Sequence, residues 1–301
     1  MSESFADAKA AALRRPYRQE ITVLLKAMRQ NKIREPRLVV EMGSLALSKF
    51  AGGLGDERWV ICEQVFVAAL DTGNDALANS CLATLMDKFP ESSRVKRLVG
   101  IQCEAKAQYP AASETYAELL EANPANALAM KRRVAVLKGQ GKVKEAVKTL
   151  NAFVDQFQSD VTAWQELAGL YLSMSKYDAA AFCFEECILH DPMNHMLHCR
   201  LAEVYYTLGD YPTARKYFAQ ALEIKKTGNV RSLHGLAACC NAIAESSKLS
   251  KEQRGRSEVN EALHSHAASE LASLYSKEAP ALLPALEKVL EMQTAALEKG
   301  K

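Results

Sequence analysis

The amino-acid sequence predicts an all-α solenoid, a right-handed superhelix built from stacked helical hairpins. Three observations support this prediction. Apolar and aromatic residues recur with a period of 34 residues, alanine recurs at one position of every repeat, and proline follows the second predicted helix in several repeats. Self-similarity at a fixed period of about 20 to 50 residues is the signature of a repeat architecture.

The repeat is most complete in the unit that begins at Val161, which is position 1 of 34. Positions 4, 7, 8, 11, 20, 24, 27 and 32 of this unit hold Trp164, Leu167, Ala168, Tyr171, Ala180, Phe184, Cys187 and Pro192. One period later the pattern returns as Leu201, Ala202, Tyr205, Ala214, Phe218 and Ala221. Five units run in phase, at residues 59–92, 93–126, 127–160, 161–194 and 195–228. This is the tetratricopeptide pattern, with two antiparallel helices in each repeat.

Position 20 is alanine in all five units, and these residues are Ala78, Ala112, Ala146, Ala180 and Ala214. A small side chain at this point lets the two helices of a hairpin touch, while a large residue at position 24 fills the adjoining groove. We therefore expect these alanines to form the repeat packing together with Trp164, Tyr171, Phe184, Tyr205 and Phe218.

Proline and glycine mark the expected helix ends. Pro90, Pro124 and Pro192 each lack an N–H group and disfavour helical backbone in the preceding residue, so each predicts the end of a second helix. The turns between the two helices of a repeat are predicted at Gly73-Asn74, Gly139-Gln140-Gly141 and Gly209-Asp210.

The segments outside the five repeats complete the predicted domain organisation. Residues 1–58 are predicted to form an N-terminal helical hairpin, with amphipathic helices at 17–29 and 38–50, and a glycine-rich linker. Residues 229–301 are predicted to form a degenerate sixth repeat, a polar loop at 245–257 and C-terminal capping helices.

Composition limits the compartment and the partners. The formal net charge is +2, so no overall field favours nucleic acid or a membrane surface. The first twenty residues carry Glu3, Asp7, Arg14 and Arg15 and lack the apolar segment of a secretory signal. The sequence contains no run of 18 consecutive apolar residues, so no transmembrane span is predicted. With eight cysteines and no signal peptide, we expect free thiols in the cytosol.

The sequence offers no catalytic constellation, and we expect neither a catalytic residue nor a bound cofactor or metal. No phosphate-binding glycine loop, G-x-S-x-G or H-E-x-x-H motif occurs. The one cluster with metal-ligating side chains comprises Cys183, Cys187, His190, His195, His198 and Cys199. A zinc site would need four of them to converge, whereas Cys187 occupies a packing position of the repeat. Buried cysteines that pack as small apolar residues are the favoured interpretation.

A local excess of positive charge predicts a partner-binding surface. In the tetratricopeptide family, positions 2, 5, 9 and 12 of the first helix face the concave groove, which places Arg94, Arg97, Lys131 and Lys138 there. Such a wall could grip carboxylates or an acidic segment, and a merely solvated basic face is the alternative interpretation. No unit combines the lysine at position 5 with the asparagine at position 9 that form a carboxylate clamp in some members of the family.

Several stretches resemble the subunit 2 family of the endoplasmic reticulum membrane protein complex. They are LGDERW at 54–59, CEQV at 62–65, AALD at 68–71, FP at 89–90, RVKRL at 94–98, YD at 177–178, AAFC at 180–183, DP at 191–192, NH at 194–195 and ARKYFAQAL at 214–222. The similarity runs in order through residues 38–245 and keeps the phase of the repeats. It is far more specific than the repeat pattern alone.

This resemblance implies a non-catalytic scaffold at the cytosolic face of the endoplasmic reticulum, peripheral to the membrane. The implied partners are cytosolic segments of the membrane subunits of the complex and a second soluble cytosolic subunit. The complex supports insertion of tail-anchored and multipass membrane proteins, with the insertase chemistry in membrane subunits of the Oxa1/YidC group.

The sequence also bears on three other classes of function. A free cytosolic cochaperone or adaptor that binds peptide segments is the main alternative. An RNA-binding repeat protein would need a larger basic excess than this sequence carries. An enzyme would need a perturbed catalytic pair in a dry pocket, which no motif here indicates.

Overall fold

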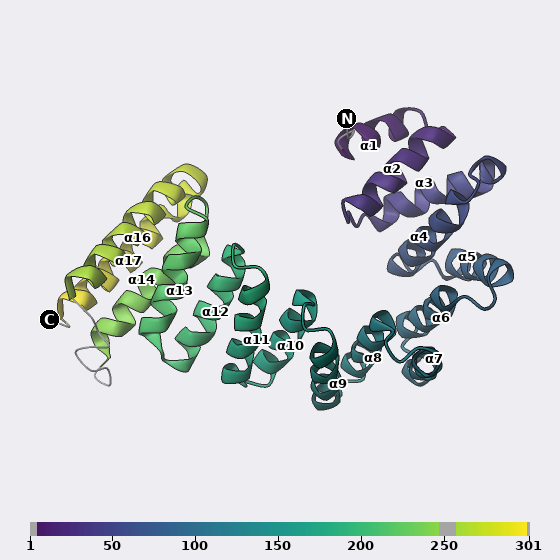
Figure 1. Ribbon diagram of the computed structural model, residues 1–301. Coiled ribbons are helices and arrows are strands. Elements are labelled where there is room, and N and C mark those ends of the chain that lie inside the picture. The colour runs from purple at the N-terminus through teal and green to yellow at the C-terminus, as the bar shows by residue number, and fades with distance from the viewer. Residues whose placement is uncertain (1–4, 247–256, 300–301) are drawn as a thin grey trace. The chain divides into compact units, whose positions relative to one another are not determined.

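The computed structural model of the chain describes residues 5–246 and 257–299. Within these residues the secondary structure is entirely helical, with sixteen α-helices and two short 3₁₀ helices, which confirms the predicted all-α class. The chain forms two compact units, Met1–Lys142 and Val143–Lys301, and each is described by itself. In both units consecutive helices run in opposite directions as hairpins (Figure 1).

The first unit contains eight α-helices. They are α1 Phe5–Arg14, α2 Arg18–Gln30, α3 Pro36–Lys49, α4 Glu57–Asp71, α5 Asp75–Lys88, α6 Ser93–Ala105, α7 Tyr109–Ala122 and α8 Ala127–Gly139, with a 3₁₀ turn at Ala51–Gly53. α2 and α3 overlap the two predicted N-terminal helices. α1 has no counterpart in the sequence prediction, and it buries Ala8 and Ala12 in the same core as α2. The N-terminal region therefore holds one helix more than a hairpin.

The second unit contains the remaining helices among the described residues. They are α9 Val143–Gln156, α10 Val161–Ser173, α11 Tyr177–His190, α12 His195–Leu208, α13 Tyr211–Ile224, α14 Val230–Glu245, α16 Ser257–Glu278 and α17 Leu283–Lys299, with a 3₁₀ turn at Pro280–Leu282. α14 still includes Glu245, where the polar loop was predicted to begin. Most of that predicted loop, residues 247–256, lies outside the described residues.

Asparagine or aspartate begins the first helix of each of the last three repeats. The side-chain oxygens of Asn126 and Asp160 accept hydrogen bonds from the backbone N–H of Ala129 and Ala163, at 3.2 and 3.1 Å. Asn194 caps α12 in the same way. Each bond satisfies one of the N–H groups that the first helical turn leaves without a partner. These three caps all occupy position 34 of their repeat, so the last residue of one unit begins the next unit.

The repeat alanines lie in the interior of the fold. Ala78, Ala112, Ala146, Ala180 and Ala214 are all fully buried. Of the aromatic packing positions, Trp164, Phe184 and Phe218 are buried. Tyr171 and Tyr205 are only half-buried, because each directs its hydroxyl to a polar partner, Asn151 and Glu185 respectively.

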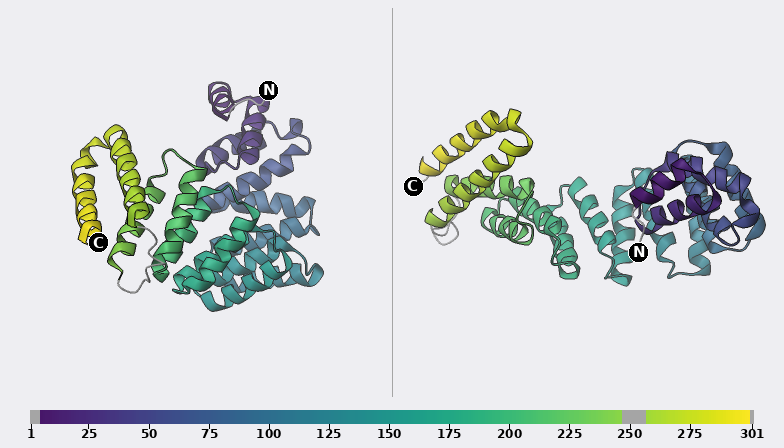
Figure 2. Two further views of the ribbon diagram at one scale, coloured as in Figure 1. Left: turned by 60° about the vertical axis from the view of Figure 1, so that its left-hand side comes forward. Right: turned by 90° about the horizontal axis from the view of Figure 1, so that it is seen from above.

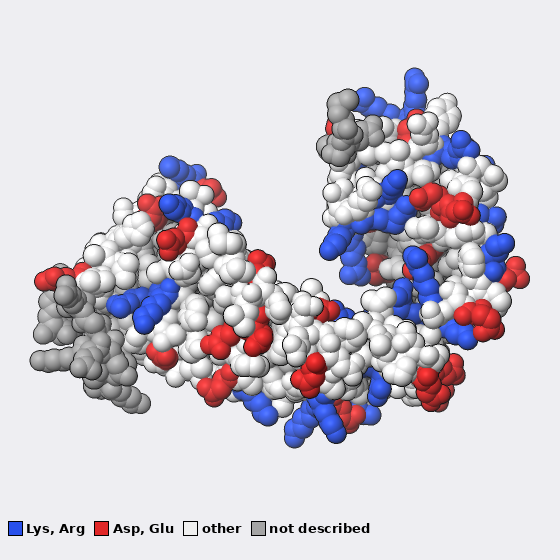
Figure 3. Space-filling model, in the orientation of Figure 1, with Lys and Arg blue, Asp and Glu red and all other residues white. Residues whose placement is uncertain are grey.

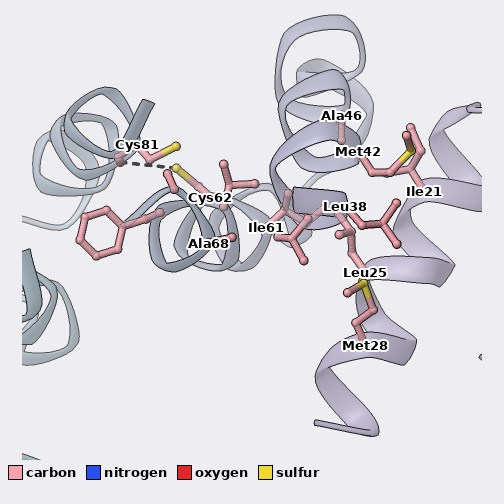
Figure 4. Close-up of a cluster of buried hydrophobic side chains, with 14 of the residues drawn as sticks. Ile21, Leu25, Met28, Leu38, Met42, Ala46, Ile61, Cys62, Ala68 and Cys81 are labelled. Atoms are coloured by element: carbon pink, nitrogen blue, oxygen red, sulfur yellow. Dashed lines mark hydrogen bonds between the residues drawn. The ribbon is translucent and has the colours of Figure 1, made fainter. Parts of the chain in front are cut away.

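The N-terminal core joins helices from several hairpins. Figure 4 shows Ile21, Leu25 and Met28 of α2 packed toward Leu38 and Met42 of α3. All of these side chains are at least nine-tenths buried. α3 packs in turn against α4, so the predicted N-terminal hairpin is continuous with the first repeat. Burial of this apolar surface is the main stabilising contribution to the unit.

A glycine makes room for the large residue at position 24. A Cβ added at Gly100 would lie 2.5 Å from the Tyr116 ring, far inside van der Waals contact. We therefore expect Gly100→Ala to lower the free energy of unfolding by about 1–3 kcal/mol through overpacking, as measured by urea denaturation. Gly169→Ala is the matched control, since a Cβ added there would meet nothing within 4 Å beyond its chain neighbours and the backbone of its own helix. It should stabilise its helix by about 0.5–1 kcal/mol, and equal losses for both variants would contradict the packing argument.

The last helices form a cap on the second unit. α16 and α17 pack against α14 and against each other, and their pairing is visible in both views of Figure 2. Ala267 and Leu271 of α16 and Leu286 and Leu290 of α17 enter the core that also holds Phe218. These helices cover an apolar face that the last repeat would otherwise expose to water.

Two histidines in this region make stability depend on pH. Burial lowers the pKa of His234 and of His264 below the usual value. The unfolded imidazoles bind protons near pH ~6.5, whereas the folded ones bind them only at lower pH. Their contribution to stability is therefore complete above about pH 6.5 and is lost as pH falls through the folded pKa. We expect the thermal midpoint to drop between about pH 7.5 and 5.5, and to drop less in His264→Gln. An unchanged drop in that variant would assign the effect to other groups.

Candidate partner-binding groove

The four predicted groove residues lie on two neighbouring first helices. Arg94 and Arg97 are on α6, and Lys131 and Lys138 are on α8. These helices contact each other within the first unit. Arg94 and Lys138 are exposed, whereas Arg97 and Lys131 are partly buried. The assignment of these residues to partner binding stays a prediction.

Carboxylates lie among these basic side chains. Glu63 of α4 has one carboxylate oxygen 2.6 Å from Nε of Arg94 and the other 3.7 Å from Nη2 of Arg97. The Glu63 side chain is only 19% exposed, so this contact is partly shielded from solvent. The surface that was predicted as basic is therefore a network of alternating charge. Figure 3 shows blue and red side chains interspersed over this unit.

A second carboxylate, that of Glu104, extends the network of charged side chains. It accepts a 2.5 Å hydrogen bond from the hydroxyl of Tyr116 and lies 3.4 Å from a guanidinium nitrogen of Arg132. Burial, followed by the bond to Glu104, raises the pKa of Tyr116, so this hydroxyl stays a donor. Glu104 thus links the inner core residue Tyr116 to the charged surface.

The sequence prediction assigned only basic residues to the groove, although the register also places these carboxylates there. Counted from the start of their repeats, Glu63 lies at position 5 and Glu104 at position 12, both groove positions. Glu203 of the second unit lies at position 9, and both of its oxygens accept hydrogen bonds from Arg231. The prediction considered only basic residues and therefore left out the acidic residues at the same groove positions.

Two adjoining cavities lie beside the Glu63 cluster. The larger has a volume of about 330 Å³, with an apolar floor that includes Val39, Val60 and Val67 and a charged rim that includes Arg34 and Asp71. The smaller, of about 220 Å³, is lined by Trp59, Phe89 and Leu98 among others. Val60, Glu63 and Arg94 line both cavities. We call this combined depression the α4–α6 groove.

The α4–α6 groove can bind a polypeptide segment of mixed character. Its apolar floor can take aliphatic or aromatic side chains, and its rim offers both acids and bases for hydrogen bonds. Arg34 bonds to both oxygens of Asp71, at 3.1 and 2.7 Å, so the rim is ordered by ion pairs before any partner arrives. Such preformed geometry lowers the entropic cost of binding.

The second unit has a depression with related chemistry. A cavity of about 420 Å³ is lined by Glu203, Arg231, Tyr206, His234 and Phe218 among others. As in the first unit, an arginine–glutamate pair stands beside aromatic side chains. Both units thus carry a depression lined by apolar and charged side chains.

The cysteine and histidine cluster of the second unit is split between packing and local hydrogen bonds. Cys183 and Cys187 are buried in α11, and burial raises the pKa of each thiol to about 12. A ring nitrogen of His198 lies 2.9 Å from the carbonyl oxygen of Pro192. Within residues 5–246 and 257–299, no three histidine, cysteine or acidic side chains converge as metal ligands. In the same residues, no helix is both long and apolar enough to cross a bilayer.

Comparison with known proteins identifies the relatives of the chain. A family model described as the EMC2 TPR-like repeat domain matches residues 77–223. The chain is 42% identical over 233 residues to ER membrane protein complex subunit 2-A of Xenopus laevis, covering 76% of this chain and 78% of that protein. It is 34% identical over 215 residues to the TPR repeat protein oca3 of Schizosaccharomyces pombe, covering 70% and 76%.

Solved structures support the fold. The C-terminal part of a TPR repeat-containing protein from Cytophaga hutchinsonii superposes with a TM-score of 0.54, covering 93% of this chain and 98% of that one. The two sequences are 15% identical, so the match concerns the fold alone. The predicted tetratricopeptide solenoid is confirmed.

Proposed function

The chain belongs to the family of ER membrane protein complex subunit 2, and from this membership we propose that it is a non-catalytic scaffold subunit of such a complex. In this role it lies at the cytosolic face of the endoplasmic reticulum as a peripheral protein. It holds cytosolic segments of the membrane subunits and contacts a second soluble subunit. Through this assembly it supports insertion of tail-anchored and multipass membrane proteins.

The observation that carries the proposal is the α4–α6 groove. Its floor is apolar, its rim carries ion pairs of both signs, and its cavities of about 330 and 220 Å³ suit individual side chains of a bound segment. Groups placed for general acid–base or nucleophilic chemistry would need a paired donor and acceptor around a reacting atom. The charged groups of this groove are instead engaged with one another, which favours docking over turnover.

The experiment that tests the proposal is isolation of the tagged endogenous protein from membranes in mild detergent, followed by identification of what co-purifies. We expect multi-spanning subunits in stoichiometric amounts and another soluble subunit. Recovery of cytosolic chaperones alone, with the tagged protein absent from membranes, would overturn the scaffold role and favour a free peptide-binding cochaperone. Turnover by the pure protein would overturn the non-catalytic assignment.

A further inference from the structure

Two cysteines face each other across the first tetratricopeptide hairpin. Cys62 is on α4 and Cys81 on α5, and these helices pack against each other. The sulfur of Cys62 donates a hydrogen bond to the carbonyl oxygen of Cys81 at 3.4 Å. Figure 4 shows both sulfur atoms in the space between the two helices, directed toward one another. Two thiols on separate helices are thus held in proximity by the fold.

A cavity connects this pair with the surface. Its volume is about 550 Å³, and both Cys62 and Cys81 line it together with Arg58, Ser80 and Thr84. The two cysteines are 2% and 4% exposed, so a protein-sized reagent cannot reach them. A molecule as small as a hydroperoxide can enter a cavity of this size, and the polar lining provides hydrogen-bonding partners for it.

The two thiols differ in acidity. Besides the bond to the Cys81 carbonyl, a hydrogen bond between the two thiol side chains is the largest cause that raises the pKa of Cys62, and burial adds to it. The same bond lowers the pKa of Cys81, against an opposing effect of burial. Cys81 is therefore the member that ionises first, and Cys62 retains its proton. This division of roles is the one that thiol oxidation requires, because the thiolate is the nucleophile.

We propose that Cys62 and Cys81 form a redox-active thiol pair that hydroperoxides convert to a disulfide linking α4 and α5. The Cys81 thiolate attacks the peroxide, a sulfur–oxygen bond forms, the oxygen–oxygen bond breaks, and the departing alkoxide or hydroxide takes up a proton. Cys62 sulfur then attacks the resulting sulfenic acid. The new sulfur–sulfur bond displaces the oxygen, which leaves as water with the proton of Cys62. In balance, two thiols and one hydroperoxide give a disulfide, an alcohol or water, and water.

Other cysteines of the chain provide an internal comparison. Cys183 occupies position 23 of its repeat, as Cys81 does, and it is also buried. Its nearest cysteine in the sequence, Cys187, follows it by one turn on the same helix, and burial raises the pKa of both to about 12. Cys81 and Cys183 therefore share their burial and their repeat position. What distinguishes Cys81 is the second cysteine, Cys62, that faces it from another helix.

The test uses the full chain and one tryptic digest. Residues 59–88 contain both Cys62 and Cys81 without an internal lysine or arginine, and residues 177–200 likewise contain Cys183, Cys187 and Cys199. The folded protein is treated with graded hydrogen peroxide, denatured with an alkylating reagent and digested. We expect peptide 59–88 to lose two hydrogens and to escape alkylation at doses that leave 177–200 fully alkylated. Treatment with dithiothreitol before alkylation should restore it.

Serine variants assign the two roles. In Cys62→Ser, Cys81 should accumulate sulfenic and then sulfinic acid, because the resolving thiol is missing. In Cys81→Ser, Cys62 should stay reduced at the same dose. The proposal is overturned if wild-type peptide 59–88 is alkylated at both cysteines while 177–200 oxidises, or if Cys62 oxidises as fast without Cys81. The wild-type result does not depend on whether either variant folds.

Discussion

Phe153→Ala is expected to lower the free energy of unfolding by about 3–5 kcal/mol. Phe153 is fully buried in α9 and stacks on Phe157, with ring centroids 4.7 Å apart. It occupies position 27 of its repeat, a position that the other repeats fill with leucine, cysteine or alanine. Removing the ring forfeits its transfer free energy and leaves a cavity that the surrounding helices cannot fully close. Urea denaturation followed by circular dichroism measures the loss.

Phe182→Ala is the matched control for this prediction. Phe182 is the same residue type in a neighbouring hairpin, but it is 53% exposed and contacts Trp164 edge-on at 6.1 Å between ring centroids. Its truncation should cost about 1 kcal/mol or less. If the two variants lose the same free energy, burial within the repeat is not what stabilises this unit.

Arg97→Glu combined with Lys131→Glu is expected to reduce recovery of the membrane subunits by about tenfold or more, as rim charges of an interface control association. Arg97 stands beside Glu63, so the first change replaces an attraction with a repulsion between two partly buried carboxylates. The second change reverses the charge at a partly buried position of the neighbouring helix. The measurement is quantitative co-purification from solubilised membranes, compared at equal amounts of folded protein.

Lys144→Glu combined with Lys148→Glu provides the control for charge alone. Both lysines are exposed on α9, and the pair changes the net charge by the same amount. Recovery should stay near that of the unchanged protein. Equal losses from both double variants would show that overall charge governs assembly. An undiminished recovery with the first would show that the predicted basic surface around Arg97 and Lys131 is not a docking surface.

The repeat made most of the fold predictable from the sequence. Each second helix that precedes Pro90, Pro124 or Pro192 ends two residues before that proline, as the loss of an N–H donor dictates. The five predicted alanines are fully buried. α1 escaped prediction because ten alanine-rich residues carry only a short apolar stripe, which periodicity alone distinguishes poorly from a polar segment.

The candidate site was predictable only in part. The repeat register located the helix faces, but pairing depends on the side-chain conformations that bring Glu63 to Arg94 and Glu104 to Tyr116. The thiol pair was not predictable from the sequence either, since Cys62 and Cys81 lie 19 residues apart on different helices. The sequence shows how many cysteines there are. That two of them face each other follows from the packing of α4 against α5.

The position-34 caps bear on how the chain folds while it is being made. Asp160 ends one repeat in the sequence and caps the first helix of the next repeat through its bond to Ala163. The residue that starts this helix is therefore already synthesised when the helix emerges. The extensive helix contacts within each unit join elements at most three helices apart along the chain. Contacts of such short sequence separation can form progressively from the ribosome outward. In the second unit, the helices α16 and α17, which cover its last apolar face, are synthesised last.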